Sequence, residues 1–576
     1  MADSIPAASA AAAEQLPPTA SALAVSLQRL LNVAIENFKR IPGSAIVARY
    51  VASSYQNDPI RSLLELFLVL FAIRTVLQSR TRSGASGTNF VNLTGKEIDD
   101  LVGEFKPEPL CAPLSPAESR ELASIPTIVG GASSRPKISL PSHNAGKPTQ
   151  VMNLASYNFT NLAGHEAVKE KAIETLRAYG VGSCSPPGFY GTIDVHMQLE
   201  TDIARFLGTQ NCIIYSQGFS TISSVIPAFS KRGDIIVADR GVNYAIQKGI
   251  QISRSTVYWY DHNDMDSLRA VLEQVKRDDK RRHGPLTRRF IVTEGIFEGD
   301  GALSDLLTIL ELKRKYKFRL ILDESISFGT VGATGRGLTE LYSAPASDVE
   351  ILVGSMANTL GAAGGFCAGS DEVVFHQRIN GTSFVFSAAL PAMLAVAAST
   401  AISYMVSQPS ILTTLQDNVR ALRAVLDHVE CLRISSDPRS ALVHIQVRSK
   451  TDRHPATPED KWQRGKDRLS VGDVSVALAH TANNDKRAKL GPLEHDLSVD
   501  EQMRLLQAIV EDVLEHGILL TRMKRLPSIN PAVLEVAPES RPNIRVAVSA
   551  AFTKKEMDKA ANVIKASAIR VLGKRR

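Results

Sequence analysis

Short apolar runs alternate with amphipathic stretches along most of the chain after residue 150. Six of these runs have the length of buried strands, and they lie at residues 212–215, 235–238, 256–259, 290–292, 320–322 and 351–353. The segments between them, such as 266–275 and 303–315, place apolar residues at helical spacing. Strands that alternate with helices are typical of a mostly parallel sheet with helices on both faces. We therefore predict an α/β fold from residue 151 onward.

The first ninety residues have a different pattern. They open with an Ala-, Ser- and Pro-rich tail that we expect to be disordered. Apolar residues from Leu23 to Phe38 have helical spacing, which fits an amphipathic helix on a membrane and a docked surface helix equally well. Residues 60–77 are strongly apolar, and at ~1.5 Å per residue they approach the ~30 Å of a bilayer core. We predict a membrane span there, although a buried soluble helix has the same pattern.

Polar signals divide the rest of the chain. Residues 83–88 form a Gly- and Ser-rich stretch that predicts a linker. Within residues 91–150, Thr94 to Glu97 and Ser115 to Glu118 both match the capping box, so each predicts the start of a short helix. Residues 448–500 are rich in charged residues with few large apolar ones, and we expect a mobile insertion loop there.

Composition and charge narrow the function classes. The chain has 576 residues with 44% hydrophobic content, which is enough for two packed domains. Its five cysteines lack a Cys-x-x-Cys pair, which favours free thiols in a reducing compartment. A net charge of +7, with short basic runs, favours a solvated surface and argues against nucleic-acid binding. His196 and Glu200 have no third ligand nearby, so we expect a structural role for both and no metal site.

Candidate site residues follow the predicted strands. Asp239, Glu294, Asp323 and Asn358 each come shortly after one of the apolar runs. On a mostly parallel sheet, ligands bind beyond the carboxyl ends of the strands. We therefore expect these four side chains to lie along the ligand-binding edge of the sheet.

Three motifs carry a resemblance to a known family. They are Gly188–Glu200 (GFYGTIDVHMQLE), Asp323–Gly337 (DESISFGTVGATGRG) and Gly354–Gly365 (GSMANTLGAAGG). In order and spacing they resemble the α-oxoamine synthases, a family of fold-type I pyridoxal-phosphate (PLP) enzymes, and within it the long-chain-base subunits of sphingolipid synthesis. The resemblance implies a PLP-transferase-like large domain at residues 151–405 and a smaller C-terminal α/β domain at residues 406–576.

The resemblance also implies that the cofactor site of this chain is dismantled. Asn358 stands where active relatives carry the lysine that holds PLP, and an amide cannot form that covalent bond. No lysine occurs between residues 317 and 450 to replace it. Asn243 and Ile326 stand at two histidine positions, and neither residue can do acid–base work. Asp323 matches the aspartate that pairs with the pyridine nitrogen of PLP, and we expect it to be vestigial and to hold a glycine-rich turn.

A two-fold dimer gives such a chain a role. In fold-type I enzymes the two sites lie at the interface, so a chain without its own chemistry still completes the site of its partner. By resemblance, Ser387 and secondly Thr382 contact the phosphate of the PLP that the partner holds. Cys184, Phe189 and Tyr190 are expected at the interface, with Cys184 as a packed small side chain rather than a reactive thiol.

The expected activity belongs to a complex. The resemblance implies a non-catalytic subunit that joins a lysine-bearing second subunit, with PLP on that partner, to condense L-serine with palmitoyl-CoA. The product, 3-ketodihydrosphingosine, begins sphingolipid synthesis. The resemblance further implies the endoplasmic reticulum membrane, with most of the chain in the cytosol, and small membrane regulatory subunits as further partners. The alternative is a membrane-bound pseudoenzyme that acts as a scaffold or regulator without a part in turnover.

Overall fold

The structure, a computed structural model, describes most of the chain between residues 42 and 573. The described residues are 32–33, 36–37, 39–40, 42–83, 94–107, 110, 113–131, 133–140, 146–282, 287–448, 497–523 and 541–573. The predicted tail and nearly all of the predicted linker and polar insertion lie outside these ranges, as does most of the amphipathic stretch before Phe38. Two compact units are present, residues 1–113 and residues 114–576.

The first unit contains three described helices of some length. They are α2 (Ser44–Asn57), α3 (Pro59–Ser83) and α4 (Gly95–Glu104). The capping box predicted at Thr94 and Glu97 is formed at the start of α4, because each side chain bonds the backbone N–H of the other residue. The second predicted box, at Ser115 and Glu118, is formed in the same way and begins α5 (Pro116–Ala123) in the second unit.

The membrane span predicted over residues 60–77 is not found in the structure. That stretch is helical and lies in α3, but among the described residues there is no helix with the length and apolar character needed to cross a membrane. Three charged residues fall within the stretch, namely Arg61, Glu65 and Arg74. Arg61 and Glu65 form an ion pair at 3.1 Å on the surface of the helix. These charges lower the apolar character that the run of leucines and phenylalanines had suggested.

A seven-stranded sheet forms the centre of the second unit, in the order β5-β11-β10-β9-β8-β6-β7. Its strands are β5 (Asn211–Tyr215), β6 (Ile235–Asp239), β7 (Thr256–Tyr260), β8 (Arg289–Glu294), β9 (Arg319–Asp323), β10 (Ile351–Ser355) and β11 (Gly365–Gly369). All six predicted strands are present. The sequence did not predict β11, which runs antiparallel to both β5 and β10, so the sheet is mixed although mostly parallel.

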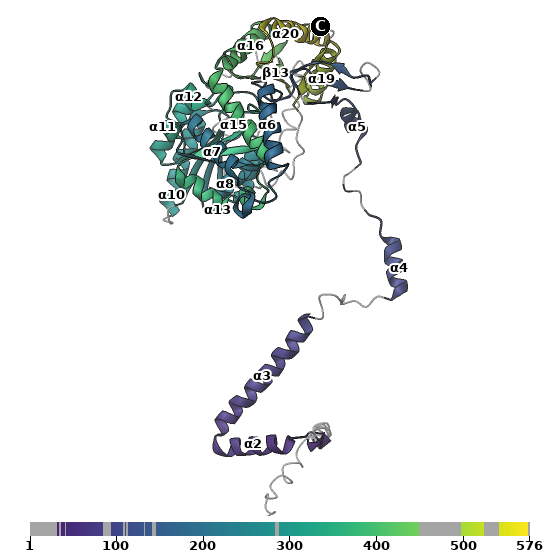
Figure 1. The fold of residues 1–576 in the computed structure, drawn as a ribbon, viewed down its shortest axis with the longest axis vertical. Helices are drawn as coiled ribbons and strands as arrows, with labels where there is room; N and C mark the ends of the chain where they lie inside the picture. Colours follow the sequence, from purple (N-terminus) through teal and green to yellow (C-terminus); the bar gives the residue numbers. More distant parts are fainter. Residues whose placement is uncertain are drawn as a thin grey trace, which may run out of the picture. The chain divides into compact units, whose positions relative to one another are not determined.

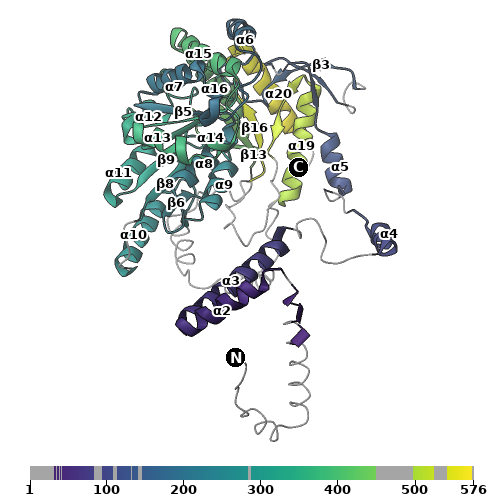
Figure 2. The same cartoon turned by 60° about the horizontal axis from the view of Figure 1, so that its bottom comes forward.

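Helices cover both faces of this sheet (Figures 1 and 2). They are α6 (Glu166–Tyr179), α7 (Asp194–Leu207), α8 (Gly218–Phe229), α9 (Tyr244–Ser253), α10 (Met265–Arg282), α11 (Leu306–Tyr316), α12 (Leu338–Leu341), α13 (Asp371–Asn380), α14 (Thr382–Phe386) and α15 (Ala392–Ser407). Alternate residues of one strand enter different cores. Ile235 and Val237 belong to the larger hydrophobic cluster, whereas Ile236 and Ala238 belong to the second one. This alternation is the reason that the strands read as continuous apolar runs.

A second sheet lies toward the C-terminus, within the residues predicted as the small domain. Its strands, in the order β12-β13-β16-β15, are β12 (Leu432–Ile434), β13 (Leu442–Val447), β16 (Ile544–Ala547) and β15 (Thr521–Arg522), and all pairs are antiparallel. The accompanying helices are α16 (Ser410–Leu426), α19 (Val499–Glu515) and α20 (Lys554–Gly573). Shorter strands precede the large sheet, namely β1 (Thr127–Val129), β2 (Lys137–Ser139), β3 (Thr149–Gln150) and β4 (Met152–Asn153), the last of which pairs with β14 (Ile518–Leu519). The exact domain boundary stays a prediction.

Candidate functional site

The predicted site residues meet at one edge of the large sheet. Asp239, Glu294 and Asp323 are the last residues of β6, β8 and β9, and all three carboxylates are buried. Asn358 follows β10 by three residues and is half-buried. The expectation that residues following the parallel strands lie along one edge of the sheet therefore placed these four side chains correctly.

Asn243 and Asp323 are directly bonded to each other. The Asn243 amide Nδ2 donates to Asp323 Oδ2 at 3.1 Å, while Asn243 Oδ1 accepts from the backbone N–H of Ile246 and so begins α9. The other carboxylate oxygen of Asp323 accepts from Ser325 N at 2.9 Å. Burial raises the pKa of Asp323 above its ordinary value, although the hydrogen bonds from Ser325 and Asn243 oppose that shift. Both oxygens of the vestigial aspartate thus have partners within this chain.

The other two replaced positions are also used structurally. The amide Nδ2 of Asn358 donates to Ser325 O at 2.8 Å, which ties the turn after β10 to the turn after β9. Ile326 is buried in the larger hydrophobic cluster. An asparagine amide offers no amine for a covalent bond, and the amide of Asn243 is already bonded on both sides. The residues at this edge therefore do not fit a covalently held PLP.

The glycine-rich turn is held by the residue after Asp323. Both carboxylate oxygens of Glu324 lie within hydrogen-bond distance of Leu338 N, at 3.0 and 3.1 Å, and the Ser327 hydroxyl also donates to Glu324. Burial outweighs these bonds and raises the pKa of Glu324 to about 7. The expectation that Asp323 itself holds this turn is wrong, because its carboxylate bonds to Asn243 and Ser325 instead.

A second polar group adjoins this edge, and the sequence predicted only Glu294 among its members. Glu294 accepts from Asn243 N at 2.6 Å, and burial together with the nearby Asp323 raises its pKa well above the ordinary range. Glu298 accepts from Tyr157 Oη at 3.1 Å and from Arg545 Nη1 at 3.3 Å. The Arg545 guanidinium also lies 4.8 Å from the centre of the Tyr157 ring. Residues 157 and 545 are too far apart in the sequence for any local pattern to pair them.

A connecting loop, residues 297–301, joins the edge to the C-terminal sheet. The ring nitrogens of His262 lie 2.8 Å from Asp239 and 3.1 Å from Asp300. Burial opposes a charge on His262, but the two carboxylates outweigh it and raise its pKa to about 10. Asp437 N donates to Gly301 O at 3.1 Å, so the loop is bonded on both sides.

The predicted interface residues lie in a second region, on the turn η2 (Pro187–Gly191) and around α14. Phe189 and Tyr190 are 60% and 99% exposed, and Tyr190 has a φ of 71°. Thr382 is exposed and Ser387 is half-buried. The structure brings the two segments together, because Ala389 N donates to Ser185 O at 3.0 Å. Cys184 was expected as a packed small side chain near the interface. Within this chain alone it is exposed, with a φ of 60°, and its packing against a partner stays a prediction.

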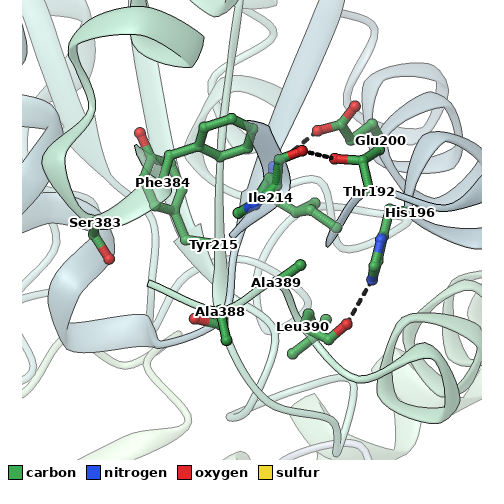
Figure 3. Close-up of a pocket in the computed structure, with 12 residues that line it drawn as sticks. Thr192, His196, Glu200, Ile214, Tyr215, Ser383, Phe384, Ala388, Ala389 and Leu390 are labelled. Atoms are coloured by element: carbon green, nitrogen blue, oxygen red, sulfur yellow. Dashed lines mark hydrogen bonds between the residues drawn. The ribbon is translucent and has the colours of Figure 1, made fainter. Parts of the chain in front are cut away.

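A pocket lies between these segments and the first strand of the large sheet (Figure 3). Its walls come from η2, α7, β5 and α14, with Thr192, Tyr215, Ser383 and Phe384 among the lining residues. His196 donates from Nε2 to Leu390 O at 2.5 Å.

The buried polar side chains at this pocket are occupied by structural bonds. The Glu200 carboxylate pairs with Arg378 at 2.6 Å, and the Tyr215 hydroxyl donates to Gln377 at 2.9 Å. His196 and Glu200 thus hold elements together, which is the role that the sequence predicted for them.

Comparisons with known proteins define the class first. The family described as aminotransferase class I and II matches residues 149–564, so the chain belongs to that family of PLP-type folds. The chain belongs, more narrowly, with the proteins named serine palmitoyltransferase 1 and long chain base biosynthesis protein 1. Serine palmitoyltransferase 1 of Saccharomyces cerevisiae is 37% identical over 92% of both chains. Long chain base biosynthesis protein 1b of Oryza sativa subsp. japonica is 45% identical over 68% of this chain and 79% of the relative.

Solved structures confirm the fold. Serine palmitoyltransferase of Sphingomonas wittichii superimposes with a TM-score of 0.61 at 17% identity and covers 84% of this chain and 99% of that chain. A high-resolution structure of SPT with a PLP internal aldimine gives a TM-score of 0.61 at 18% identity and covers 83% of this chain and 98% of that chain. The fold-type I prediction for the large domain is therefore confirmed.

Proposed function

We propose that this chain is the non-catalytic subunit of a serine palmitoyltransferase, the complex that condenses L-serine with palmitoyl-CoA to 3-ketodihydrosphingosine. The observation that carries the proposal is Asn358, which lies at the ligand-binding edge in place of a lysine and is bonded to Ser325. The mutual hydrogen bond of Asn243 and Asp323 supports it, because the groups that a cofactor would use already have partners. The relatives at 34–45% identity carry names that fit this role.

In this proposal PLP is held by a lysine-bearing partner subunit. This chain supplies one wall of the shared site, where Thr382 and Ser387 contact the cofactor phosphate of the partner. Phe189 and Tyr190 lie in the subunit interface, with Cys184 beside them. Burial of exposed rings at about 25 cal/mol per Å² of apolar surface gives such an interface its free energy.

The location and the smaller partners also belong to the proposal. Three cysteines in the described part of the chain, Cys184, Cys212 and Cys367, are free thiols, which is consistent with a cytosolic face. We place the complex at the endoplasmic reticulum, where a lipid product enters the membrane directly, and we expect small membrane subunits to regulate it.

The test uses the full chain, alone and purified together with a lysine-bearing subunit. We expect the visible absorbance of lysine-bound PLP, and release of CoA that depends on both serine and palmitoyl-CoA, only in the complex. The lysine-bearing subunit alone is the control, and its turnover should be far lower. Binding without any change in turnover would favour the scaffold or regulator instead. Turnover by this chain alone would contradict the argument from Asn358.

A further inference from the structure

The short helix α14 lacks the side-chain cap that the residue just before a helix normally provides. The cap position is Gly381, which has no side chain to accept from the free N–H groups of the first turn. A larger residue does not fit, because an added Cβ would lie 2.7 Å from Gln377 O and 2.8 Å from Tyr215 Oη. The acceptor for these N–H groups therefore has to come from elsewhere in the fold.

A serine on another helix supplies that acceptor. Ser224 lies on α8 and is only 2% exposed, and its Oγ accepts from Ser383 N at 3.1 Å. The same oxygen lies 3.4 Å from Thr382 Oγ1. One turn earlier on α8, Ser220 Oγ accepts from the Ser383 hydroxyl at 2.8 Å. Ser224 thus caps α14 from another helix, and Ser220 holds the Ser383 side chain beside it.

The far end of the same segment is also bonded, to the turn that precedes η2. Ala389 N donates to Ser185 O, and Ser183 Oγ donates to Ala389 O at 2.6 Å. Phe384 and Ala389 line the pocket below the segment (Figure 3), whereas Phe386 is 80% exposed above it. Hydrogen bonds therefore fix both ends of segment 382–389, and Thr382 lies at the end that Ser224 bonds.

We propose that Ser224 is a positioning residue for the shared cofactor site: it fixes the first turn of α14 so that Thr382 reaches the phosphate of the partner's PLP. This inference rests on the proposed function. A hydrogen bond weakens steeply once its distance exceeds about 3.2 Å, so fraying of one helical turn is enough to lose the contact. Ser224 itself touches neither the cofactor nor the substrate.

The experiment replaces Ser224 by Ala in the full chain and purifies it with the lysine-bearing subunit. Loss of an N-terminal cap costs about 0.5–2 kcal/mol, so we expect the dissociation constant of PLP to rise by about 2-fold to 30-fold. Turnover at saturating PLP should stay near that of the unchanged complex. Ser223→Ala is the matched control, because Ser223 Oγ donates to Phe219 O of its own helix and, within the described residues, has no bond to α14; it should leave PLP affinity unchanged.

A second pair of variants separates positioning from general stability. If Ser224 acts through Thr382, Ser224→Ala should add little to PLP affinity in a Thr382→Ala background, as a double-mutant cycle measures. Additive effects would overturn the proposal, as would Ser224→Ala complexes that bind PLP as tightly as Ser223→Ala complexes. Lower thermal stability of the complex with unchanged PLP affinity would reduce Ser224 to a structural residue and also overturn it.

A separate comparison tests the proposed function independently of the role of Ser224. The proposed function would be wrong if the lysine-bearing subunit had the same PLP affinity and the same turnover with and without the unchanged chain. Because this comparison uses no variant, it can be made before the effect of Ser224→Ala is measured. Such a result would also remove the basis for a positioning role of Ser224.

Discussion

At the scale of single residues, the side chains at the ligand-binding edge of the large sheet bond to one another and to the backbone. Asn243, Asp323 and Asn358 bond to one another or to Ser325, and Ile326 packs into the core. Unpaired buried polar groups cost about 1–3 kcal/mol each, so replacements that pair with each other keep the fold stable without a ligand. In this chain these residues therefore have a structural role.

This exchange predicts that a lysine alone does not restore the site. Asn358→Lys supplies an amine, but Asn243 still occupies Asp323 and the histidine positions stay replaced. We expect the variant chain, mixed with PLP, to show no visible absorbance of lysine-bound cofactor. The measurement is a spectrum before and after borohydride reduction, with a lysine-bearing relative as the control. A stable, reducible band in the variant would mean that the rest of the site is still competent.

The sequence predicted the site only where a residue follows a strand. Asp323 and Asn358 were placed correctly because the carboxyl ends of neighbouring parallel strands meet at one edge. Contacts between distant segments, such as Tyr157 with Arg545 or Ser224 with Ser383, leave no periodic signal.

At the scale of elements, the large sheet was predictable except for one strand. The six runs that form β5 to β10 are apolar apart from Thr256 at the start of β7, and amphipathic stretches separate them. In contrast, β11 begins and ends with glycine and follows a glycine-rich turn, so its three inner residues did not stand out. Its burial comes from pairing on both sides, with β5 and β10, which only the three-dimensional arrangement provides.

The connecting loop, residues 297–301, gives the sharpest prediction at this scale. Gly301 has a φ of 75°, and an added Cβ would lie 2.5 Å from both Leu442 O and the Ser436 Cβ. Gly208 has the same φ, but nothing lies within 4 Å of its added Cβ. Gly208→Ala should therefore cost about 1 kcal/mol for backbone strain alone, and Gly301→Ala roughly 2–4 kcal/mol because a steric clash is added.

Denaturant unfolding of the two variants, at matched protein concentration, measures this difference. A larger loss of unfolding free energy for Gly301→Ala than for Gly208→Ala would confirm that the connecting loop packs tightly against the C-terminal sheet. Equal losses for the two variants would mean that the loop can move away from β13 at little cost.

At the scale of the whole molecule, one histidine links stability to pH. His262 is bonded to Asp239 at the end of β6 and to Asp300 in the connecting loop, and the Phe297 ring packs edge-on against it at 4.5 Å. Its pKa of about 10 in the fold exceeds the ordinary value of about 6.5. Its charge therefore stabilises the fold fully below pH ~6.5, and this stabilisation is lost as the pH rises toward about 10.

His262→Gln should accordingly reduce the free energy of unfolding most at pH 6, on the order of 3 kcal/mol, and much less at pH 10. Thermal or denaturant unfolding across this pH range measures the difference from the unchanged chain. His428, which is exposed, provides the control, and His428→Gln should change the free energy of unfolding only slightly. A constant penalty for His262→Gln at every pH would show that its hydrogen bonds matter and its charge does not.

The pairing of β5 with β11 also governs how the chain acquires its structure during synthesis. Strand β5 is almost entirely apolar, and its described partner strand is made roughly 150 residues later. At about 5–20 residues per second, a ribosome leaves that edge unpaired for roughly 10–30 s. A nascent chain with such an open strand edge is a natural substrate for chaperones. Its yield in cells should therefore depend on translation speed between β5 and β11 more than on the stability of the finished fold.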